Sequence, residues 1–217
     1  MKLTINRDQF LKGLNISAKA IGSKSPIPVM SNVKIDMTDA GLELTGSNTE
    51  LTIKTTIPLK LGDQEIIRDY QIGSTLVANK FITEIVRRLE GNEVSFEVID
   101  DTIVKISDGK SDFKLNSVKA EEYPDIDLDM QGTHISMTYN NFKDLVDQTA
   151  FAASTRDQRP ILTALNLDCV DGELTATATD SARLAKKSMT LSEKVNFSAN
   201  IPASIMSDVA HLLDEVE

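Results

Sequence analysis

The chain has 217 residues, enough for one large domain or two domains of about 100 residues each. Its 23 Lys and Arg against 33 Asp and Glu give a formal charge of −10, and its 41% hydrophobic and 26% charged residues exclude a disordered or collagen-like chain. The negative charge also argues against broad coating of nucleic acid, so any nucleic-acid role requires locally basic regions.

The first 60 residues predict a strand, a helix and three further strands. Alternating apolar residues mark strands around positions 3–5, 33–37, 42–44 and 51–57, and the turn Asp39-Ala40-Gly41 predicts a hairpin between the second and third. A helix lies between the first and second strands, with Asn6 as its N-cap and Gly22 as its end. The apolar residues at helical spacing are Phe10, Leu11, Leu14, Ala18 and Ile21.

A second unit follows with a similar order of elements. We predict a strand at 72–77, a helix at 79–89 that ends at Glu90-Gly91-Asn92, and strands at 94–98, 103–106 and 113–118. The stretch 121–129 then carries five acidic residues and Pro124, which is typical of a linker.

Both units recur after the linker. At an offset of 132, Phe10 matches Phe142 and Pro28 matches Pro160, and at an offset of 124, Ile85 meets Val209. Repeats of this length indicate duplicated domains. We therefore predict an α+β fold of duplicated strand-helix-strand-strand-strand units, with two helices packed on antiparallel sheets in each domain.

The repeat also predicts the domain boundaries. Domain one should cover 1–120, an acidic linker 121–131 and a second domain 132–217. In domain one three strands follow the second helix, whereas in domain two the chain stops directly after it. We therefore expect the second domain to be truncated and the chain to be a fragment of a longer protein, with an uncovered sheet edge that favours pairing with another chain.

The helices of domain one are basic in an acidic chain. Residues 7–24 contain four bases and one acid, and residues 79–88 contain three bases and one acid. Solvated helix faces would account for either helix alone. The alternative is that the same element of each unit presents a basic face to a polyanion, and domain two supports this only through the bases Arg156 and Arg159 at the end of its first helical region.

Neither a catalytic nor a metal-binding arrangement is visible in the sequence. Gly109-Lys110-Ser111 lacks the glycine that a phosphate-binding loop needs five positions earlier, so it is expected to be a hairpin turn. His134 and His211 each lack a neighbouring ligand, Cys169 is expected to be buried in a strand, and Asp180 has no acid–base partner. We predict that the protein is not an enzyme and has no cofactor or metal.

The sequence predicts a soluble, cytoplasmic protein. No apolar run approaches the roughly 20 residues that span a bilayer, and the N-terminus lacks a secretory signal. A single cysteine cannot form an intrachain disulfide.

Five segments along the chain stand out: the start MKLTI, Pro26 to Val33, Leu44 to Asn48, Ala120 to Pro124 and the motif from Ala178 to Ala185. Together they resemble, along the whole chain, the family of bacterial DNA polymerase III beta subunits, or sliding clamps. The resemblance implies three clamp domains per subunit, the third being absent here, and a head-to-tail homodimeric ring with helices around the hole. It also implies a processivity factor that encircles duplex DNA without reading its sequence. Its partners would be the replicative polymerase, the clamp loader and repair polymerases, held through short peptide segments, with no membrane contact.

The resemblance also implies three sets of residues. The DNA-binding positions fall on Lys24, Asn79, Lys80, Arg156, Pro160 and Ile161. The partner-peptide pocket falls on Arg159, Leu162, Thr179, Ser181, Ala182, Arg183 and Leu184. The dimer interface of the full-length protein falls on Lys80, Phe113 and Leu115. The alternation of Phe113-Lys114-Leu115 places the two apolar residues on one face of a strand at the edge of domain one. A fragment without domain three should therefore not close into a ring.

Two other functions remain open from the sequence. A β-rich peptide-binding scaffold that does not act on DNA would have the same duplicated domains. A nucleotidyltransferase or nuclease is disfavoured by the lack of clustered carboxylates for a metal.

Overall fold

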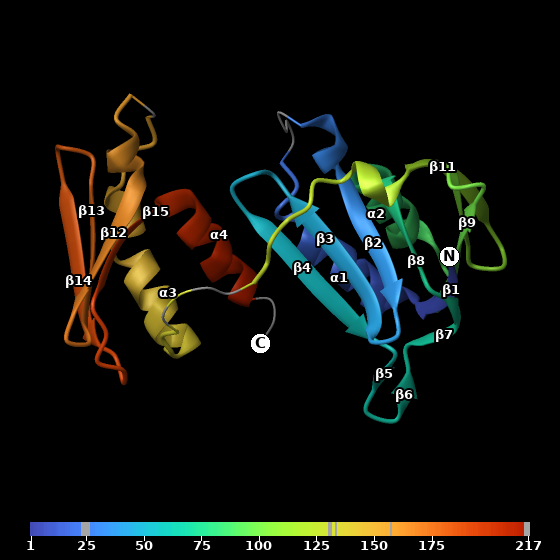
Figure 1. Ribbon diagram of the computed structural model, residues 1–217, viewed down its shortest axis with the longest axis horizontal. Coiled ribbons are helices and arrows are strands. Elements are labelled where there is room, and N and C mark those ends of the chain that lie inside the picture. Colours follow the sequence, from blue (N-terminus) through green and yellow to red (C-terminus); the bar gives the residue numbers. More distant parts are fainter. Residues whose placement is uncertain (23–26, 130–131, 133, 157, 215–217) are drawn as a thin grey trace. The chain divides into compact units, whose positions relative to one another are not determined.

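The computed structural model describes residues 1–22, 27–129, 132, 134–156 and 158–214. The chain divides into two compact units, unit 1 (Met1–Asp127) and unit 2 (Leu128–Glu217), as Figure 1 shows.

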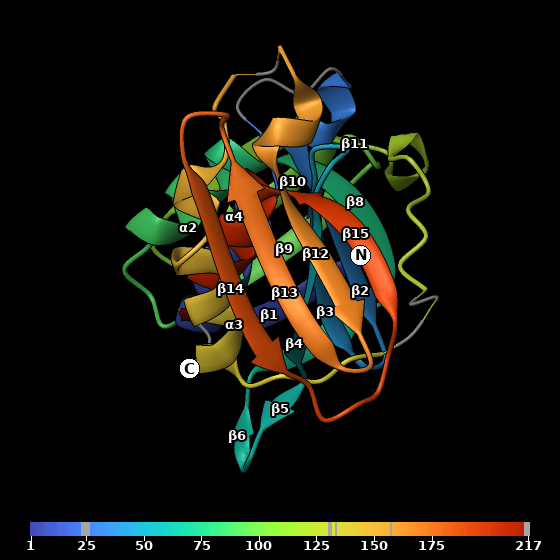
Figure 2. The same cartoon turned by 90° about the vertical axis from the view of Figure 1, so that its left-hand side faces the viewer.

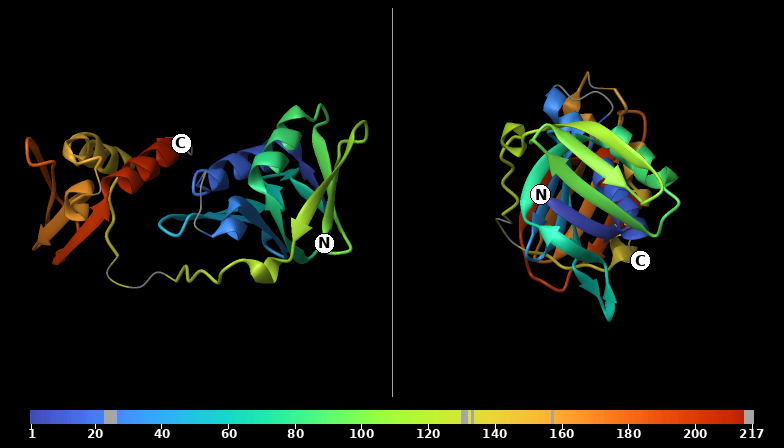
Figure 3. Two further views of the ribbon diagram at one scale, coloured as in Figure 1. Left: turned by 90° about the horizontal axis from the view of Figure 1, so that it is seen from above. Right: turned by 90° about the vertical axis from the view of Figure 1, so that its right-hand side faces the viewer.

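Unit 1 is built on an antiparallel sheet with the strand order β4-β3-β2-β8-β11-β10-β9-β1-β7, and β5 and β6 form a separate two-stranded ribbon. Two helices, α1 (Arg7–Ala18) and α2 (Asn79–Arg88), lie side by side against it (Figures 1 and 3). The 3-10 turns are η1 (Pro28–Ser31) and η2 (Ala120–Glu122). The strands are β1 (Lys2–Asn6), β2 (Asn32–Thr38), β3 (Gly41–Ser47), β4 (Thr52–Pro58), β5 (Lys60–Leu61), β6 (Gln64–Glu65), β7 (Ile67–Gln71), β8 (Gly73–Ala78), β9 (Glu93–Ile99), β10 (Ile103–Ser107) and β11 (Asp112–Val118).

The core of unit 1 lies between the helices and one face of the sheet. Phe10 of α1 meets Phe96 of β9 edge to face with ring centroids 6.2 Å apart, and both side chains are fully buried. Ile82 and Val86 of α2 belong to the same buried cluster. The opposite helix faces therefore remain free to carry polar and charged residues.

Helix α1 begins as predicted but ends earlier. Oδ1 of Asn6 accepts a hydrogen bond from the Gln9 N–H (3.1 Å), which confirms the N-cap. The prediction of an end at Gly22 is wrong, because the N–H groups of residues 19, 20 and 21 each bond to the carbonyl three residues earlier and tighten the last turn after Ala18. At this point α1 lies against β3 at Gly46, where an added Cβ would stand 2.2 Å from the Ser17 carbonyl oxygen.

Three strands were not predicted. β5 and β6 have two residues each, which is too short for an alternating pattern, and β7 carries the exposed pair Arg68 and Asp69. β7 nevertheless pairs with β1 at one end of the sheet. Hydrophobic alternation does not mark a short strand whose side chains are mostly exposed.

Unit 2 has a four-stranded antiparallel sheet in the order β14-β13-β12-β15, with α3 and α4 on one face (Figure 2). Its buried cluster includes Leu145 and Val146 of α3 and Met206 of α4. The helices are α3 (Tyr139–Asp147) and α4 (Ala203–Asp214), and the 3-10 turns are η3 (Ala150–Ala152) and η4 (Pro160–Thr163). The strands are β12 (Ala164–Val170), β13 (Glu173–Thr179), β14 (Leu184–Thr190) and β15 (Phe197–Pro202).

The positions of these elements confirm the internal repeat. α3, η4, β12, β13 and β14 begin 132 residues after α1, η1, β2, β3 and β4, and β15 and α4 begin 124 residues after β8 and α2. The register repeats as well, since Thr38 faces Gly41 in unit 1 and Val170 faces Glu173 in unit 2. The offset changes by eight residues because unit 1 has β5, β6 and β7 between β4 and β8, whereas the corresponding segment of unit 2, between β14 and β15, is eight residues shorter.

Candidate DNA-facing and peptide-binding surfaces

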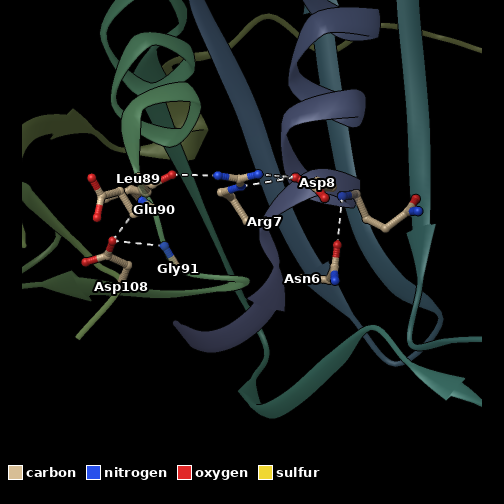
Figure 4. Close-up of polar contacts among 8 residues, drawn as sticks. Asn6, Arg7, Asp8, Leu89, Glu90, Gly91 and Asp108 are labelled. Carbon is tan, nitrogen blue, oxygen red and sulfur yellow. Dashed lines mark hydrogen bonds and ion pairs between the residues drawn. The ribbon is translucent and has the colours of Figure 1, made fainter. Parts of the chain in front are cut away.

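The first base of α1 fixes the helix to its neighbour. Nη1 of Arg7 donates to the Leu89 carbonyl at the end of α2 (2.6 Å), and Nε and Nη2 donate to Asp8 (3.0 and 2.7 Å; Figure 4). A guanidinium at the carbonyl end of a helix complements its dipole. Arg7 therefore ties α1 to α2, so its guanidinium is engaged inside unit 1.

Asp108 fixes the other side of this junction. Its Oδ2 accepts from the N–H groups of Glu90 and Gly91 (3.1 and 3.2 Å; Figure 4), and its Oδ1 accepts from those of Lys110 and Ser111 (3.0 and 2.8 Å). The Ser111 N–H, followed by those of Lys110, Gly91 and Glu90, lowers the pKa of Asp108 to about 2. The stretch Gly109-Lys110-Ser111 is thus the turn between β10 and β11, as predicted.

We expect the Asp108→Asn variant to have a lower melting temperature than the wild-type protein. In asparagine an NH2 group replaces one of the two carboxylate oxygens, and because this group cannot accept hydrogen bonds, two of the four bonds are lost. A carboxylate with a lowered pKa stabilises the fold above its unfolded pKa, near 3.8, and loses this contribution as the pH falls toward about 2. The difference in melting temperature should therefore be constant between about pH 5 and 7 and shrink below about pH 4.

Calorimetric melts across this pH range provide the measurement. The matched control is Asp101→Asn, since Asp101 is an exposed turn residue with no hydrogen bond among the described residues. A difference that stays constant down to pH 2, or one equal to that of the control, would contradict the role given to Asp108.

The remaining bases of α1 and α2 differ in how far they are neutralised. Arg87 and Arg88 both pair with Glu84, and Nη2 of Arg87 also lies 3.4 Å from Oδ1 of Asn15 on α1. Lys12 and Lys80 are exposed and have no ion pair within the described ranges. The helix face of unit 1 therefore keeps a net positive charge although the whole chain is acidic.

The predicted DNA-binding residues have different environments. Lys24 lies outside the described residues. Asn79 is the first residue of α2, where its Oδ1 accepts from Oγ1 of Thr83 (3.2 Å), and the neighbouring Lys80 is exposed. Arg156 is an exposed loop residue of unit 2, at the position that matches Lys24 in the repeat.

Pro160 and Ile161 open the turn η4, and the Ile161 side chain is 62% exposed. This turn lies 132 residues after η1, and each of the two turns leads directly into a strand, β2 in unit 1 and β12 in unit 2. An exposed cation such as Arg156 can contact a phosphate group without reading a base.

The predicted peptide-binding residues all belong to unit 2. Arg159 and Leu162 lie at η4, which packs against β13, and the others lie at the end of β13, in the turn that follows and at the start of β14. Leu184 is 67% exposed and Leu162 is partly buried, so neither is a fully buried core residue. Arg159 is exposed at the start of η4. The surface has both apolar side chains and guanidinium groups, so it remains a predicted site for an extended peptide.

The turn from Thr179 to Leu184 is held by its own side chains. Oγ1 of Thr179 donates to the Arg183 carbonyl (2.6 Å) and accepts from the Ser181 N–H (3.1 Å). Oδ1 of Asp180 accepts from the N–H groups of Ala182 and Arg183 (both 3.0 Å), and these bonds, with the nearby Arg183 charge, hold the pKa of Asp180 below its usual range. Ser181 adopts a φ of +76°, a conformation that costs a residue with a side chain about 1–3 kcal/mol.

One residue of this surface, Phe151, was not predicted from the sequence. It lies in η3, is 58% exposed, and its ring centroid is 5.7 Å from Cζ of Arg183. In the sequence it stands among alanines and resembles a core residue, so its exposure could be recognised only from the fold.

The residues expected at a dimer interface lie on two elements: Lys80 in the first turn of α2, and Phe113 and Leu115 on β11. Phe113 and Leu115 face Ile106 and Val104 on β10 and share one face of β11. The expectation that β11 is an edge strand needs correction, because its last two residues pair with β8; only the part before Ser117 extends past β8. Phe113 is exposed and Leu115 packs partly on the core.

Other possible sites have structural explanations. Cys169 is buried in β12 and its thiol donates to the Val195 carbonyl, as expected for a core cysteine. Among the residues that the structure describes, no group of three or more His, Cys, Asp or Glu side chains is arranged to hold a metal ion. None of the helices in the described ranges has the length and apolar character that crossing a membrane requires.

Comparison with known proteins gives matches along both units. The family model "DNA polymerase III beta subunit, N-terminal domain" matches residues 1–127, and the model for the central domain of the same subunit matches residues 136–217. Proteins named beta sliding clamp from Halalkalibacterium halodurans and Bacillus subtilis are each 35% identical, over 221 and 217 residues. These alignments cover 100% and 99% of the chain but 58% and 57% of the relatives, so the chain spans little more than half their length.

Solved structures agree with the fold. A crystal structure of the Bacillus subtilis DNA polymerase sliding clamp superposes with a TM-score of 0.94 at 34% identity, over 98% of this chain and 56% of that one. The DNA polymerase III beta chain of Streptococcus pneumoniae superposes with a TM-score of 0.91 at 32% identity, over 97% of this chain and 56% of that one. The predicted α+β clamp architecture is confirmed.

Proposed function

Because the chain belongs to the DNA polymerase III beta subunit family, the bacterial sliding clamps, we propose that its protein is a processivity factor, a ring that encircles duplex DNA and tethers the replicative polymerase. The observation that carries the proposal is the match of two successive clamp-domain models to units that repeat the same elements in the same register.

The charge distribution supports this function. Exposed lysines and arginines on the helices and loops attract phosphates without reading bases, while the net charge of −10 discourages binding elsewhere on the protein. Diffuse contacts of this kind set no register on the duplex, so a ring that surrounds DNA can slide along it. Retention would then depend on the closed ring more than on affinity.

The proposed partners follow from the same assignment. Short peptide segments of the replicative polymerase, the clamp loader and repair polymerases would bind at the surface formed by η4 and the turn from Thr179 to Leu184. Lys80, Phe113 and Leu115 would belong to the interface of a homodimeric ring in the full-length protein. The protein would contribute no chemistry of its own and would act in the cytoplasm, where the DNA is replicated.

The experiment that tests the proposal compares the retention of the protein on circular and linear DNA. A ring slides off a free end, whereas a peptide-binding scaffold that never encircles DNA shows no dependence on the topology of the DNA.

A further inference from the structure

Arg183 is exposed but its orientation is fixed. Nε donates to Oδ2 of Asp180 (3.0 Å), the backbone N–H donates to Oδ1 of the same residue (3.0 Å), and Cζ lies 5.7 Å from the centroid of the Phe151 ring. The terminal nitrogens Nη1 and Nη2 have no hydrogen-bond partner in the part of the chain that the structure describes. Two contacts, with Asp180 and with the Phe151 ring, thus orient the guanidinium, which keeps unused donors.

Phe151 is exposed because its neighbours are anchored in the core. Ala152 and Ala153 are buried, and their N–H groups bond to the carbonyls of Thr149 and Ala150 (3.0 and 3.1 Å). Thr149 is fully buried, and its Oγ1 donates to the Leu145 carbonyl (2.5 Å). The backbone of η3 therefore holds the ring outside the core, in contact with Arg183 from the neighbouring turn.

We propose that Phe151 is a positioning residue of the peptide-binding surface: its ring and Asp180 hold the Arg183 guanidinium so that Nη1 and Nη2 meet the carbonyl or carboxylate oxygens of an extended peptide. An apolar side chain of that peptide lies on Leu162 and Leu184. This inference rests on the proposed function. An arginine that is already ordered loses less rotamer freedom when it binds, so preorganisation increases the affinity without adding a contact to the peptide.

The test measures the affinity of the protein for a fluorescein-labelled peptide that carries the clamp-binding segment of the replicative polymerase, by fluorescence anisotropy. Phe151→Leu removes the aromatic face and should weaken binding by about threefold to tenfold. Phe151→Tyr keeps the ring and should bind like the wild type. The matched control is Phe81→Leu, since Phe81 on α2 is equally exposed at 58% and should leave the affinity unchanged.

A double-mutant cycle separates positioning from a direct contact. Arg183→Met removes the guanidinium, so Phe151→Leu should have no further effect in that background. An equal loss in both backgrounds, or wild-type affinity for Phe151→Leu, would overturn the inference and leave the proposed function intact. Failure of the wild-type protein to bind the peptide would contradict the peptide-binding part of the proposed function and the inference together.

Discussion

Replacing Lys24, Lys80 and Arg156 together by Glu should lower the loading of the protein onto duplex DNA by about tenfold or more at physiological salt. Each residue is expected to meet phosphates, and each replacement puts a negative charge where a positive one stood. The loss of three phosphate contacts should also reduce the magnitude of the negative slope of log affinity against log salt concentration by about 3. Surface plasmon resonance on immobilised duplex at several salt concentrations gives both quantities.

The matched control is Lys2, Lys60 and Lys186 replaced together by Glu. These three lysines are exposed on strands and change the net charge by the same amount. Neither triple variant should alter the free energy of unfolding by more than about 0.5 kcal/mol per site. Equal loading losses in the two variants would mean that net charge alone governs DNA binding, and the proposed DNA face would be wrong.

Phe96→Ala should have the largest effect on stability, a loss of about 3–5 kcal/mol. The side chain is fully buried and its ring meets Phe10 edge to face, so the substitution removes both buried area and an aromatic pair that joins α1 to β9. Chemical denaturation of the protein at constant pH measures the free energy.

Phe96→Leu provides the comparison, because it keeps most of the apolar volume and loses only the aromatic contact. It should cost less than half as much as Phe96→Ala. Similar losses for both variants would show that the aromatic pair, rather than the filled volume, stabilises the packing of α1.

The internal repeat could be predicted from the sequence because it depends on local signals that recur at a fixed distance. The turn at Asp39-Ala40-Gly41 and its counterpart 132 residues later both place a hairpin between two strands. The N-cap at Asn6 was also predictable, since the capping side chain lies three residues from its donor.

The contacts that the sequence did not reveal join residues far apart in the chain. Arg7 bonds to the Leu89 carbonyl 82 residues away, and this contact could not be recognised from the sequence of the helix alone. The early end of α1 coincides with its close approach to Gly46 on β3, and the exposed Phe151 ring lies 5.7 Å from Cζ of Arg183. Such features arise when elements pack and have no periodic signal in the sequence.

A protein that encircles DNA is retained according to the topology of the DNA, so retention on circular and linear DNA tests this claim most directly. The protein, in the length that the cell makes, is loaded onto nicked circular plasmid by its clamp loader, and half of the sample is cut once with a restriction enzyme. Gel filtration in a buffer of high ionic strength then separates bound from free protein. We predict that the protein stays on the circle and is lost from the linear DNA, whereas equal retention on both, or equal loss from both, would contradict the claim.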